Sequence, residues 1–418
     1  MKKLLLIALV IAFSFAREPQ QTRLKAYEKF VKVVNMIEAY YVDDINTTTI
    51  INKALKGLLP ELDAHSSYLD KKAYKELKIS TTGEFGGLGI VVGMRNGVLT
   101  IISPIDDTPA YKAGLKAGDI ILKINDKATI DMSLDEAVNL MRGKPGTKIT
   151  LTIVRKGQKP FKVTITRAII KVKSVKAKDL ENYPEIKYVR ISSFDKNVVS
   201  SLKKVLANLS KENKKGIIID LRNNPGGLLN QAVGTLDLFI DKGVLVSQKG
   251  RVKSENETYY AHSMGTYKNI PIVVLVNGGS ASASEIVSGG LQDHKRAVIV
   301  GEKTFGKGSV QAILPVNKDE AIRLTVARYY LPSGRTIQAK GVTPDIIVHP
   351  AKIEKEENEE LIKEANLKAH LKAELEKIDH KNKNKKENKN IQKIDNDLQL
   401  LTGANILKAL IISNEAKK

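Results

Sequence analysis

The stretch from Asn277 to Gln311 constrains the fold of this chain more than any other part of its sequence. It follows an apolar, β-branched run, Ile272 to Val276, which predicts a buried strand. Two glycines, a cluster of small hydroxyl residues and a helical pattern come next, then a second short apolar run and a glycine-flanked lysine, Lys307. A strand, a tight turn and a helix present a side chain at a helix N-terminus, where backbone amides and the dipole favour developing negative charge. The order predicts a nucleophile site at Ser282.

The same stretch has other interpretations. Clusters of Gly, Ser and Ala are ordinary turn residues, and most of them carry no chemistry. The segment from Gly301 to Lys307 also matches the first part of the phosphate-binding loop G-x-x-x-x-G-K-[ST]. The next residue, Gly308, lacks the hydroxyl that binds the metal ion, and a strand rather than a helix is expected to follow. A phosphate loop is therefore not expected.

Composition narrows the class of protein. A chain of 418 residues allows two or three domains, and the absence of cysteine excludes disulfides, thiol nucleophiles and cysteine-ligated zinc. The formal net charge of +22 suits an anionic partner. No recognition helix, aromatic stacking pattern or compact basic domain accompanies it in the sequence, so we interpret it as general surface charge. We expect no nucleic acid, no cofactor and no metal.

The first residues indicate where the protein works. Two lysines after Met1 form a positive region, and Leu4 to Phe13 form an apolar one. Ser14 and Ala16 then offer small residues at the −3 and −1 positions of a cleavage site. The pattern predicts a signal peptide over residues 1–16 and an exported, periplasmic protein, anchored to the inner membrane if the segment is not cleaved.

Residues 17–80 are expected to form a helical N-terminal segment. Its first helix carries an apolar stripe at spacings of three and four, made by Leu24, Tyr27, Val31, Val34, Ile37 and Tyr41. A second short helix ends at Pro60. The segment is too small for a core of its own, so it must pack on the rest of the chain or on a partner copy. His65 is interpreted as a structural or capping residue.

Residues 81–168 are expected to form a small β-rich domain. Asn96-Gly97 is a strong hairpin signal, and Ser133 with Glu136 forms a capping box at the start of a helix. Two strands, Lys148 to Val154 and Phe161 to Thr166, complete the pattern. The order of elements resembles a PDZ domain, with Gly87, Leu88, Gly89 and Ile90 where that family binds a carboxylate. Successive backbone amides can bind a terminal carboxylate, and the adjoining strand edge can accept a peptide strand.

Residues 169–350 alternate between strands and helices, which predicts an α/β core with its site at loops beyond the strand ends. Two of these loops, 222–227 and 277–283, contain glycines that permit close backbone approach. Residues 351–418 are charged and of low complexity, and are expected to be solvated or disordered. They end in a short docking helix, Leu398 to Ile412.

Several motifs in one order resemble the carboxy-terminal processing peptidases, or tail-specific proteases. These motifs are Asp220 to Gly227, Ser280 to Glu285, Phe305 to Gln311, Pro332 to Arg335 and Gly341 to Asp345. The resemblance implies an α/β multidomain protein: a helical N-terminal segment, a PDZ domain, a crotonase-like serine protease core and a polar C-terminal extension. Two positions depart from the family pattern, which usually has proline at Ala64 and often glycine at Pro225.

The resemblance also implies the roles of the site residues. Ser282 is the nucleophile, Lys307 the general base and Gln311 the residue that orients the lysine. The backbone amides of Ala283 and of Gly226 or Gly227 form the oxyanion hole.

The same resemblance implies a role for an arginine outside the catalytic core. Arg142 reaches that core when the PDZ domain holds a tail. The alternative from the residues themselves is that Arg142 only complements the C-terminal dipole of its own helix.

The chemistry of the site residues agrees with this assignment. A serine hydroxyl needs a base, and a lysine serves as one only when it is neutral, which burial favours. Gln311 lies four positions after Lys307, and an even spacing along a strand puts both side chains on one face. The competing serine–histidine arrangement would use His294, but that residue lies beyond the helix and no G-x-S-x-G elbow surrounds Ser282.

The sequence therefore predicts an exported serine endopeptidase that binds the C-terminal tails of protein substrates. The alternative is an inactive PDZ scaffold that binds tails without cutting them. The joint presence of Ser282, Lys307 and Gln311 argues against the scaffold. A homo-oligomer through the terminal helical segments and a regulatory or adaptor protein are the partners that the sequence suggests.

Overall fold

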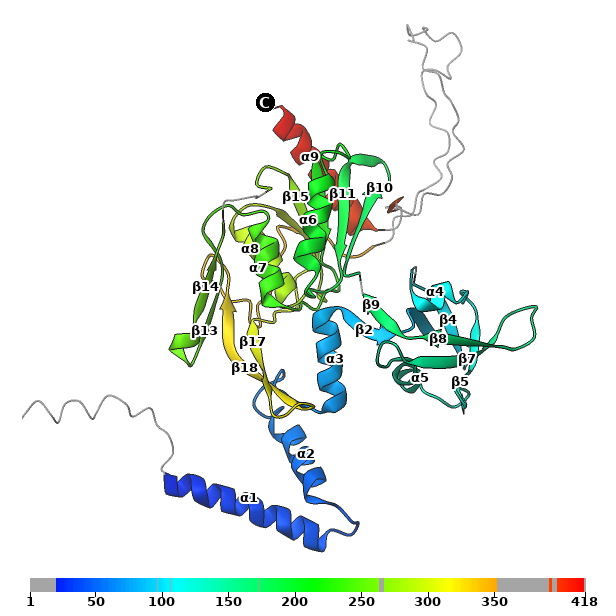
Figure 1. Cartoon of the computed structure of the whole chain (residues 1–418). Coiled ribbons are helices and arrows are strands. Elements are labelled where there is room, and N and C mark those ends of the chain that lie inside the picture. The colour runs from blue at the N-terminus through cyan, green and yellow to red at the C-terminus, as the bar shows by residue number, and fades with distance from the viewer. Residues whose placement is uncertain are drawn as a thin grey trace, which may run out of the picture. The chain divides into compact units, whose positions relative to one another are not determined.

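The computed structural model describes residues 20–95, 97–105, 107–171, 173–262, 267–351, 391–392 and 397–416. The predicted signal peptide, and most of the charged stretch after residue 351, lie outside these ranges. Within them, no helix combines the length and the apolar character that a membrane crossing requires. The chain forms two compact units (Figure 1). The first holds the described residues up to Tyr74 together with Gln311–Thr325, and the second holds Lys75–Val310 and the described residues from Val326 onward.

The first unit begins with two helices, α1 (Gln20–Tyr40) and α2 (Thr47–Leu58). Asn46 begins α2 by accepting a hydrogen bond from the Thr49 amide. A short strand, β1 (Ser67–Leu69), pairs antiparallel with the start of β18 (Ala321–Tyr330). Strand β17 (Ser309–Pro315) also pairs with β18.

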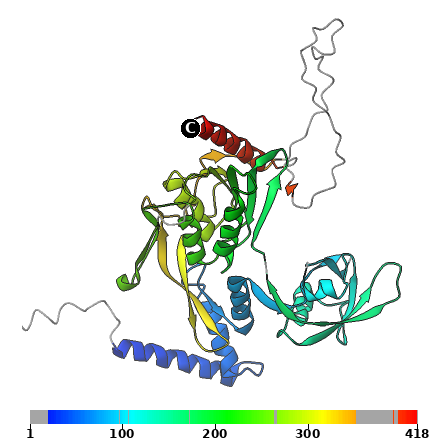
Figure 2. The same ribbon diagram turned by 45° about the horizontal axis from the view of Figure 1, so that its top comes forward.

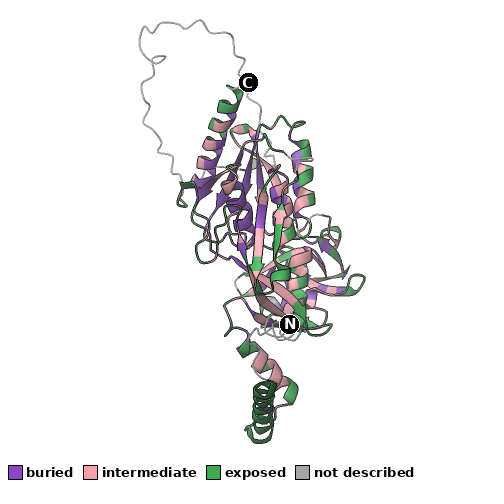
Figure 3. Cartoon of the chain, turned by 90° about the vertical axis from the view of Figure 1, so that its left-hand side faces the viewer, coloured by how far each residue is buried: buried purple, intermediate pink, exposed green. Residues whose placement is uncertain are grey.

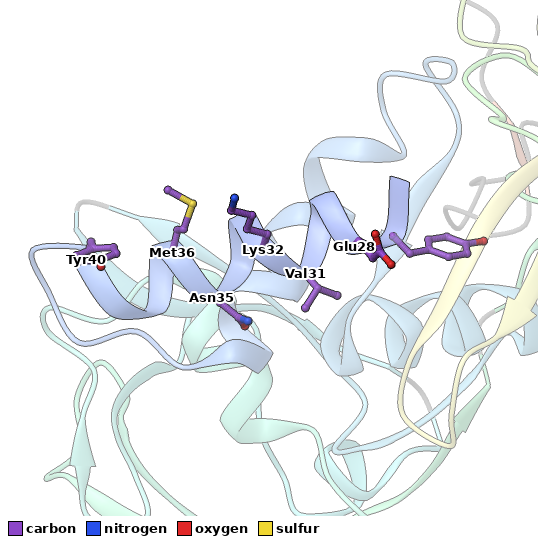
Figure 4. A pocket seen from close by; sticks show the side chains of 7 residues that line it. Glu28, Val31, Lys32, Asn35, Met36 and Tyr40 are labelled. Atoms are coloured by element: carbon purple, nitrogen blue, oxygen red, sulfur yellow. The ribbon is translucent and has the colours of Figure 1, made fainter. Parts of the chain in front are cut away.

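The apolar stripe of α1 is mostly uncovered. Within α1, all of whose residues are described, Val34 alone is buried. Figure 3 shows this helix in the colour of exposed residues. A shallow groove runs along it, lined by Tyr27, Glu28, Val31, Lys32, Asn35, Met36 and Tyr40 (Figure 4). Within the described residues α1 contacts α2 but is otherwise little covered, so packing of the segment on the rest of the chain or on a partner copy stays a prediction.

The second unit begins with the rest of α3 (Lys71–Thr82), which lies mostly within the segment expected to be helical, residues 17–80, but has no separate helix signal in the sequence. Strand β2 (Glu84–Gly87) then pairs antiparallel with β9 (Ala168–Lys171). Between them lies a β-domain of six strands around its own core. Its strands are β3 (Ile90–Arg95), β4 (Val98–Pro104), β5 (Ile120–Ile124), β6 (Lys127–Ala128), β7 (Lys148–Val154) and β8 (Phe161–Thr166).

The sequence predictions for this domain are largely confirmed. Strands β7 and β8 have the predicted bounds, and β3 and β4 pair on either side of the predicted Asn-Gly turn. Helix α4 (Pro109–Lys112) follows Thr108, and α5 (Leu134–Met141) packs against β3. The capping box of α5 is present, because the Ser133 amide donates to Glu136 at 2.9 Å and the Glu136 amide donates to the Ser133 hydroxyl at 3.2 Å.

A seven-stranded sheet forms the α/β core, in the order β19-β16-β15-β12-β11-β10-β20. Figure 1 labels its strands β15, β11 and β10. The strands are β10 (Val175–Leu180), β11 (Tyr183–Ile191), β12 (Gly216–Asp220), β15 (Ile272–Val276), β16 (Val298–Gly301), β19 (Ile346–Ile347) and β20 (Ile391–Gln392). Every neighbouring pair is parallel except β10 with β11. β12 and β15 are buried along their whole length, which explains their continuous apolar sequences.

Helices cover both faces of this sheet. Buried residues of α6 (Val198–Asn208), α7 (Leu229–Asp237) and α8 (Ala283–Asp293) share one core with alternate strand residues such as Ile217 and Val274. The other strand residues, such as Ile218 and Val273, pack against α9 (Leu398–Glu415), the red helix in Figure 2. The predicted C-terminal docking helix thus docks on the chain's own sheet. A hairpin of β13 (Val244–Gly250) and β14 (Glu257–Tyr260) pairs with the end of β18.

Strands β12 and β15 are adjacent and parallel, so their carboxyl ends lie at the same edge of the sheet. The loops that leave them are the two glycine-containing loops singled out in the sequence, 222–227 and 277–283. The topology therefore brings these loops together at one edge.

Candidate active site

Ser282 lies at the turn between β15 and α8, directly before the first residue of the helix. Its backbone has φ = +55°, a left-handed conformation that is uncommon for a residue with a side chain and costs ~1–3 kcal/mol. The helix that it begins is buried from Ala283 to Leu291. Surrounding structure therefore holds the turn in a conformation that an isolated chain would avoid.

Glu285 holds this turn in place. The side chain is fully buried, and its Oε2 atom accepts hydrogen bonds from the backbone amides of Ser282 at 2.7 Å and Lys307 at 2.8 Å. Its Oε1 atom accepts from the Gly306 amide at 2.7 Å and from the Thr304 hydroxyl at 2.6 Å. One carboxylate thus joins the turn that carries the candidate nucleophile to the loop that carries the candidate base.

Glu285 ends the motif from Ser280 to Glu285, but the sequence assigns it no role. A usable signal exists, because Ser282 and Glu285 have the S-x-x-E spacing of a capping box. The structure forms the carboxylate half of that box, from Glu285 to the Ser282 amide. The contacts to residues 304–307 could not be read from local sequence.

Asn224 ties the two glycine-containing loops together. Its side chain is fully buried, and its amide donates to the Ile191 carbonyl at 2.9 Å. Its backbone carbonyl accepts from the Ala281 amide at 3.0 Å and from the Ser284 hydroxyl at 2.9 Å. The loop at residues 222–227 is thereby fixed against the first turn of α8.

The two candidate oxyanion glycines differ in their contacts. Gly226 has φ = +99°, and a Cβ atom there would lie 2.7 Å from the Ala281 carbonyl oxygen, so only glycine is tolerated. Its amide donates to the Asn224 side-chain oxygen at 2.9 Å. Because that N–H is already engaged, the geometry favours Gly227 as the glycine amide that faces an oxyanion beside Ala283.

Lys307 lies in the loop between β16 and β17, not on a strand. The expectation that Lys307 and Gln311 share one face of a strand is therefore wrong, because β17 begins only at Ser309. Gly308 is packed so closely that a Cβ atom there would lie 2.5 Å from the Gln338 amide nitrogen. A strand follows the lysine, as expected, and the helix that a phosphate loop requires is absent from this described part of the chain.

Gln311 lies on β17 and belongs to the first unit. Its side-chain nitrogen donates to the hydroxyl of Thr325 on β18 at 3.3 Å. His294, the residue that a serine–histidine arrangement would need, lies at the opposite end of α8 from Ser282, ~16 Å along the helix. Its ring contacts the carbonyl of Val244 at 2.7 Å. The helix between them thus excludes a pair of Ser282 with His294.

A partly buried ionic network lies at the start of the loop at residues 222–227. Arg222 contacts Asp220 and forms two 2.8 Å bonds with the carboxylate of Asp397, the residue that begins α9. Burial opposes the charge on Arg222, but the two carboxylates outweigh burial and raise its pKa. Tyr188 donates to Asp220 at 2.8 Å, and burial followed by that carboxylate raises the pKa of the phenol. The network fastens the C-terminal helix to the glycine-containing loop.

The predicted carboxylate loop of the β-domain lies between β2 and β3. Gly89 has φ = +81°, and a Cβ atom there would lie 2.2 Å from the Thr108 side chain. The carbonyls of Leu88 and Gly89 accept hydrogen bonds from Ala110 and Ile105 within the domain. With its carbonyls turned inward, the loop has the form expected of one that presents amides to a carboxylate.

Arg142 directly follows α5, and its guanidinium carbon lies 5.0 Å from the centre of the Phe85 ring.

His65 is predicted to be structural, and its backbone amide donates to Asp63 at 2.8 Å. Among the described residues, no group of three His, Asp or Glu side chains is placed to hold a metal ion.

Comparison with known proteins agrees with this architecture. Residues 185–348 match peptidase family S41, and residues 100–155 match a PDZ domain. A carboxy-terminal-processing protease of Bartonella bacilliformis is 45% identical over 368 residues, which are 87% of this chain and 84% of the relative. The carboxy-terminal processing protease CtpA of Bacillus subtilis is 35% identical over 321 residues, 77% of this chain and 68% of that protein.

A solved structure, the photosystem II D1 C-terminal processing protease, is 27% identical and covers 77% of this chain and 92% of its own, with a TM-score of 0.45. The sequence relatives cover most of both chains, and the two family matches fall on the β-domain and on the α/β core. The chain therefore belongs to peptidase family S41, as a serine-type, carboxy-terminal-processing peptidase that carries a PDZ domain.

Proposed function

We propose that Ser282 is the nucleophile of this peptidase, Lys307 its general base and Gln311 the residue that orients the lysine. The observation that carries the proposal is the Glu285 carboxylate, which accepts the backbone amides of both Ser282 and Lys307. This buried group links the backbone segments that carry the proposed nucleophile and the proposed base.

In the proposed reaction the neutral amine of Lys307 takes the hydroxyl proton of Ser282 as its oxygen attacks the scissile carbonyl. The oxyanion that forms accepts hydrogen bonds from the amides of Ala283 and Gly227, at the positive end of α8. The lysine then gives its proton to the leaving amine. Water, deprotonated by the same lysine, attacks the acyl-enzyme, and the lysine returns that proton to the Ser282 oxygen as the ester bond breaks.

The PDZ domain and the family fit the binding of protein substrates with exposed C-terminal tails. We propose that the tail carboxylate binds the amides of the loop from Gly87 to Ile90, and that the tail adds a strand beside β3. Arg142, between this domain's α5 and β7, would couple tail binding to turnover.

We further propose that the protein is exported to the periplasm by its first 16 residues, which are either removed after Ala16 or kept as an inner-membrane anchor. Helix α1 is proposed to contact a second copy of the chain, because its apolar stripe is exposed. The alternative partner for α1 is a regulatory or adaptor protein. Light scattering of the purified Val31→Glu variant distinguishes the two partners. If α1 mediates self-association, the variant has a lower mass than the wild type, and if α1 binds another protein, the two masses are equal.

The decisive test of the activity uses the Ser282→Ala variant. Purified wild type and variant are incubated with exported proteins, and new C-termini are mapped by mass spectrometry. We expect new termini with the wild type alone. Tail binding without any new terminus in either sample would instead indicate a PDZ scaffold that does not cut.

A further inference from the structure

A chain of hydrogen bonds runs from the N-terminal segment to Gln311. The Gln311 side-chain nitrogen donates to the Thr325 hydroxyl at 3.3 Å, and that hydroxyl donates to the Asp63 carboxylate at 3.1 Å. All three residues belong to the first unit. Asp63 lies in the loop after α2, about 250 positions before Gln311, so the contact is set by tertiary structure.

The Asp63 carboxylate is itself firmly held. Its Oδ1 atom also accepts from the amides of His65 at 2.8 Å and Ser66 at 3.0 Å, and its Oδ2 atom accepts from the Ser66 hydroxyl at 2.6 Å. The same Ser66 oxygen accepts the Thr325 amide at 3.1 Å. Burial raises the pKa of Asp63, but the hydrogen bonds from Ser66, His65 and Thr325 outweigh burial and leave it below the usual value. Asp63 is therefore ionised at neutral pH.

An ionised carboxylate only accepts hydrogen bonds, and a hydroxyl has a single proton to donate. The Thr325 proton therefore points to Asp63, so toward Gln311 the Thr325 oxygen can only accept. This fixes which end of the Gln311 amide faces Thr325, because only the NH₂ end can donate. The carbonyl Oε1 is then the end that serves as an acceptor for an amine.

We propose that Asp63 is a positioning residue which, through Thr325, sets the orientation of the Gln311 amide so that its carbonyl oxygen is the group offered to the Lys307 amine. The inference rests on the proposed role of Gln311. A carbonyl that accepts one N–H of the amine directs the nitrogen lone pair, whereas a reversed amide would offer a second donor and leave the lysine unaligned. The N-terminal segment thereby has a part in catalysis although it contributes no reacting group.

The test compares variants that change the hydrogen bonds but preserve shape. Thr325→Val removes the hydroxyl that donates to Asp63, Asp63→Asn replaces the charged acceptor with a neutral amide, and Thr325→Ser keeps the hydroxyl. Turnover of an internally quenched peptide is measured with the full chain across pH. We expect Thr325→Val to lower kcat roughly ten- to a hundredfold at unchanged KM, since small misplacements of a catalytic group cost rates of this order. Thr325→Ser should retain nearly normal kcat.

The pH profile separates positioning from simple loosening of the fold. A nearby carbonyl favours the ammonium form of an amine, so its loss should move the acid limb of the pH–rate profile to lower pH in Thr325→Val. Tyr68→Phe is the matched control, because the Tyr68 hydroxyl contacts Glu320 at 2.5 Å and Asn52 at 3.2 Å in the same unit. The control should leave kcat and the profile unchanged. Equal kcat and profile in Thr325→Val and Tyr68→Phe would overturn the proposal.

A double-mutant cycle distinguishes failure of this inference from failure of the proposed function. If Gln311 acts as proposed, Gln311→Ala alone lowers kcat, and adding Thr325→Val causes no further loss. Normal kcat in Gln311→Ala would remove the role of Gln311, and the inference with it. If Gln311→Ala lowers kcat but Thr325→Val leaves it normal, the role of Gln311 stands, and only the proposed positioning by Asp63 is refuted.

Discussion

The carboxylate of Glu285 accepts the backbone amide of Ser282 at 2.7 Å, three residues before it in the chain. The same carboxylate oxygen accepts a hydrogen bond from the Lys307 amide at 2.8 Å. The other oxygen accepts hydrogen bonds from the Gly306 amide and the Thr304 hydroxyl. A buried carboxylate with four donors is fully satisfied. One side chain therefore links the backbone segments that carry the proposed nucleophile and the proposed base.

Glu285→Gln tests this link. The substituted amide has only one oxygen, so its NH₂ group would face donors that the carboxylate accepts. We expect kcat to fall on the order of a hundredfold, the cost of misplacing a catalytic group by about 1 Å. Glu302→Gln, which alters a partly exposed carboxylate paired with His349, is the control and should keep normal kcat. Equal turnover in the two variants would contradict the positioning role.

Lys307→Arg tests the assignment of the base. A guanidinium stays protonated in proteins, so it cannot accept the Ser282 proton, and cleavage should be abolished with the fold retained. Turnover of the wild type should rise with pH as the amine becomes neutral. Lys303→Arg, an exposed change four residues earlier in the same loop, should be silent. Circular dichroism checks that the fold is retained, and a peptide assay measures turnover. Near-normal turnover of Lys307→Arg would contradict the assignment of Lys307 as the base.

Elements with strong local signals could be predicted from the sequence, and others could not. Strand β15 was found from its β-branched run, and α5 from its capping box. Helix α3, although most of it lies in the segment expected to be helical, and strand β18 are not predictable as separate elements, because many of their residues are polar or charged and only partly buried. Their structure depends on tertiary contacts, which weak propensities do not reveal.

The site shows the same division. The motif around Ser282 pointed to the candidate nucleophile and to Lys307, but the Glu285 contacts to residues 304–307 exist only in the folded chain. The choice between the two oxyanion glycines likewise required the Gly226–Asn224 hydrogen bond. Residues that need a special conformation can be recognised from the local sequence. The hydrogen-bond partners of a buried polar group cannot, because they come from distant segments.

Recognition of the tail is expected to depend on its terminal carboxylate. Amidating the C-terminus of a tail peptide should weaken binding, because backbone amides of the loop from Gly87 to Ile90 would lose their anionic partner. Gly89→Ala should weaken binding of the free acid, since Gly89 has φ = +81° and a Cβ atom would meet Thr108 at 2.2 Å.

Gly97→Ala is the control for that variant, because Gly97 also has a positive φ, +77°, but has open space around it. Isothermal titration with both peptides gives the affinities. Equal affinity for free-acid and amidated tails would rule out carboxylate recognition. A loss in Gly97→Ala as large as in Gly89→Ala would show that backbone strain, rather than the loop, is responsible.

Arg142 tests coupling between tail binding and turnover. A ligand shifts a conformational equilibrium only through contacts that differ between the two states. We expect Arg142→Ala to bind tail peptides normally but to lose the stimulation of internal-peptide turnover by an added tail. Lys144→Ala, an exposed cation two residues later, should keep that stimulation. If Arg142→Ala is stimulated as strongly as the wild type, the arginine only complements the α5 dipole and the Phe85 ring.

The Arg222–Asp397 pair predicts a pH-dependent contribution to stability. Burial raises the pKa of Asp397, but Arg222 and the amides of Leu400 and Gln399 outweigh it and leave the value below normal. A carboxyl whose pKa is lowered by folding stabilises the protein above its unfolded pKa, ~3.9, and loses that effect as pH falls through the folded value. Asp397→Asn should therefore cost about 1–3 kcal/mol at neutral pH, a range discounted for partial exposure.

Calorimetry from pH 7 downward measures this dependence. The Tm difference between wild type and Asp397→Asn should be largest at neutral pH and shrink as the wild-type carboxylate becomes protonated below about pH 4. Asp241→Asn removes a more exposed pair with Lys268 and should change Tm little at any pH. Because Arg222 begins the loop that carries Gly226 and Gly227, Asp397→Asn should also lower kcat at neutral pH. A Tm difference that is independent of pH would show that Asp397 does not stabilise the protein through its charge on Arg222.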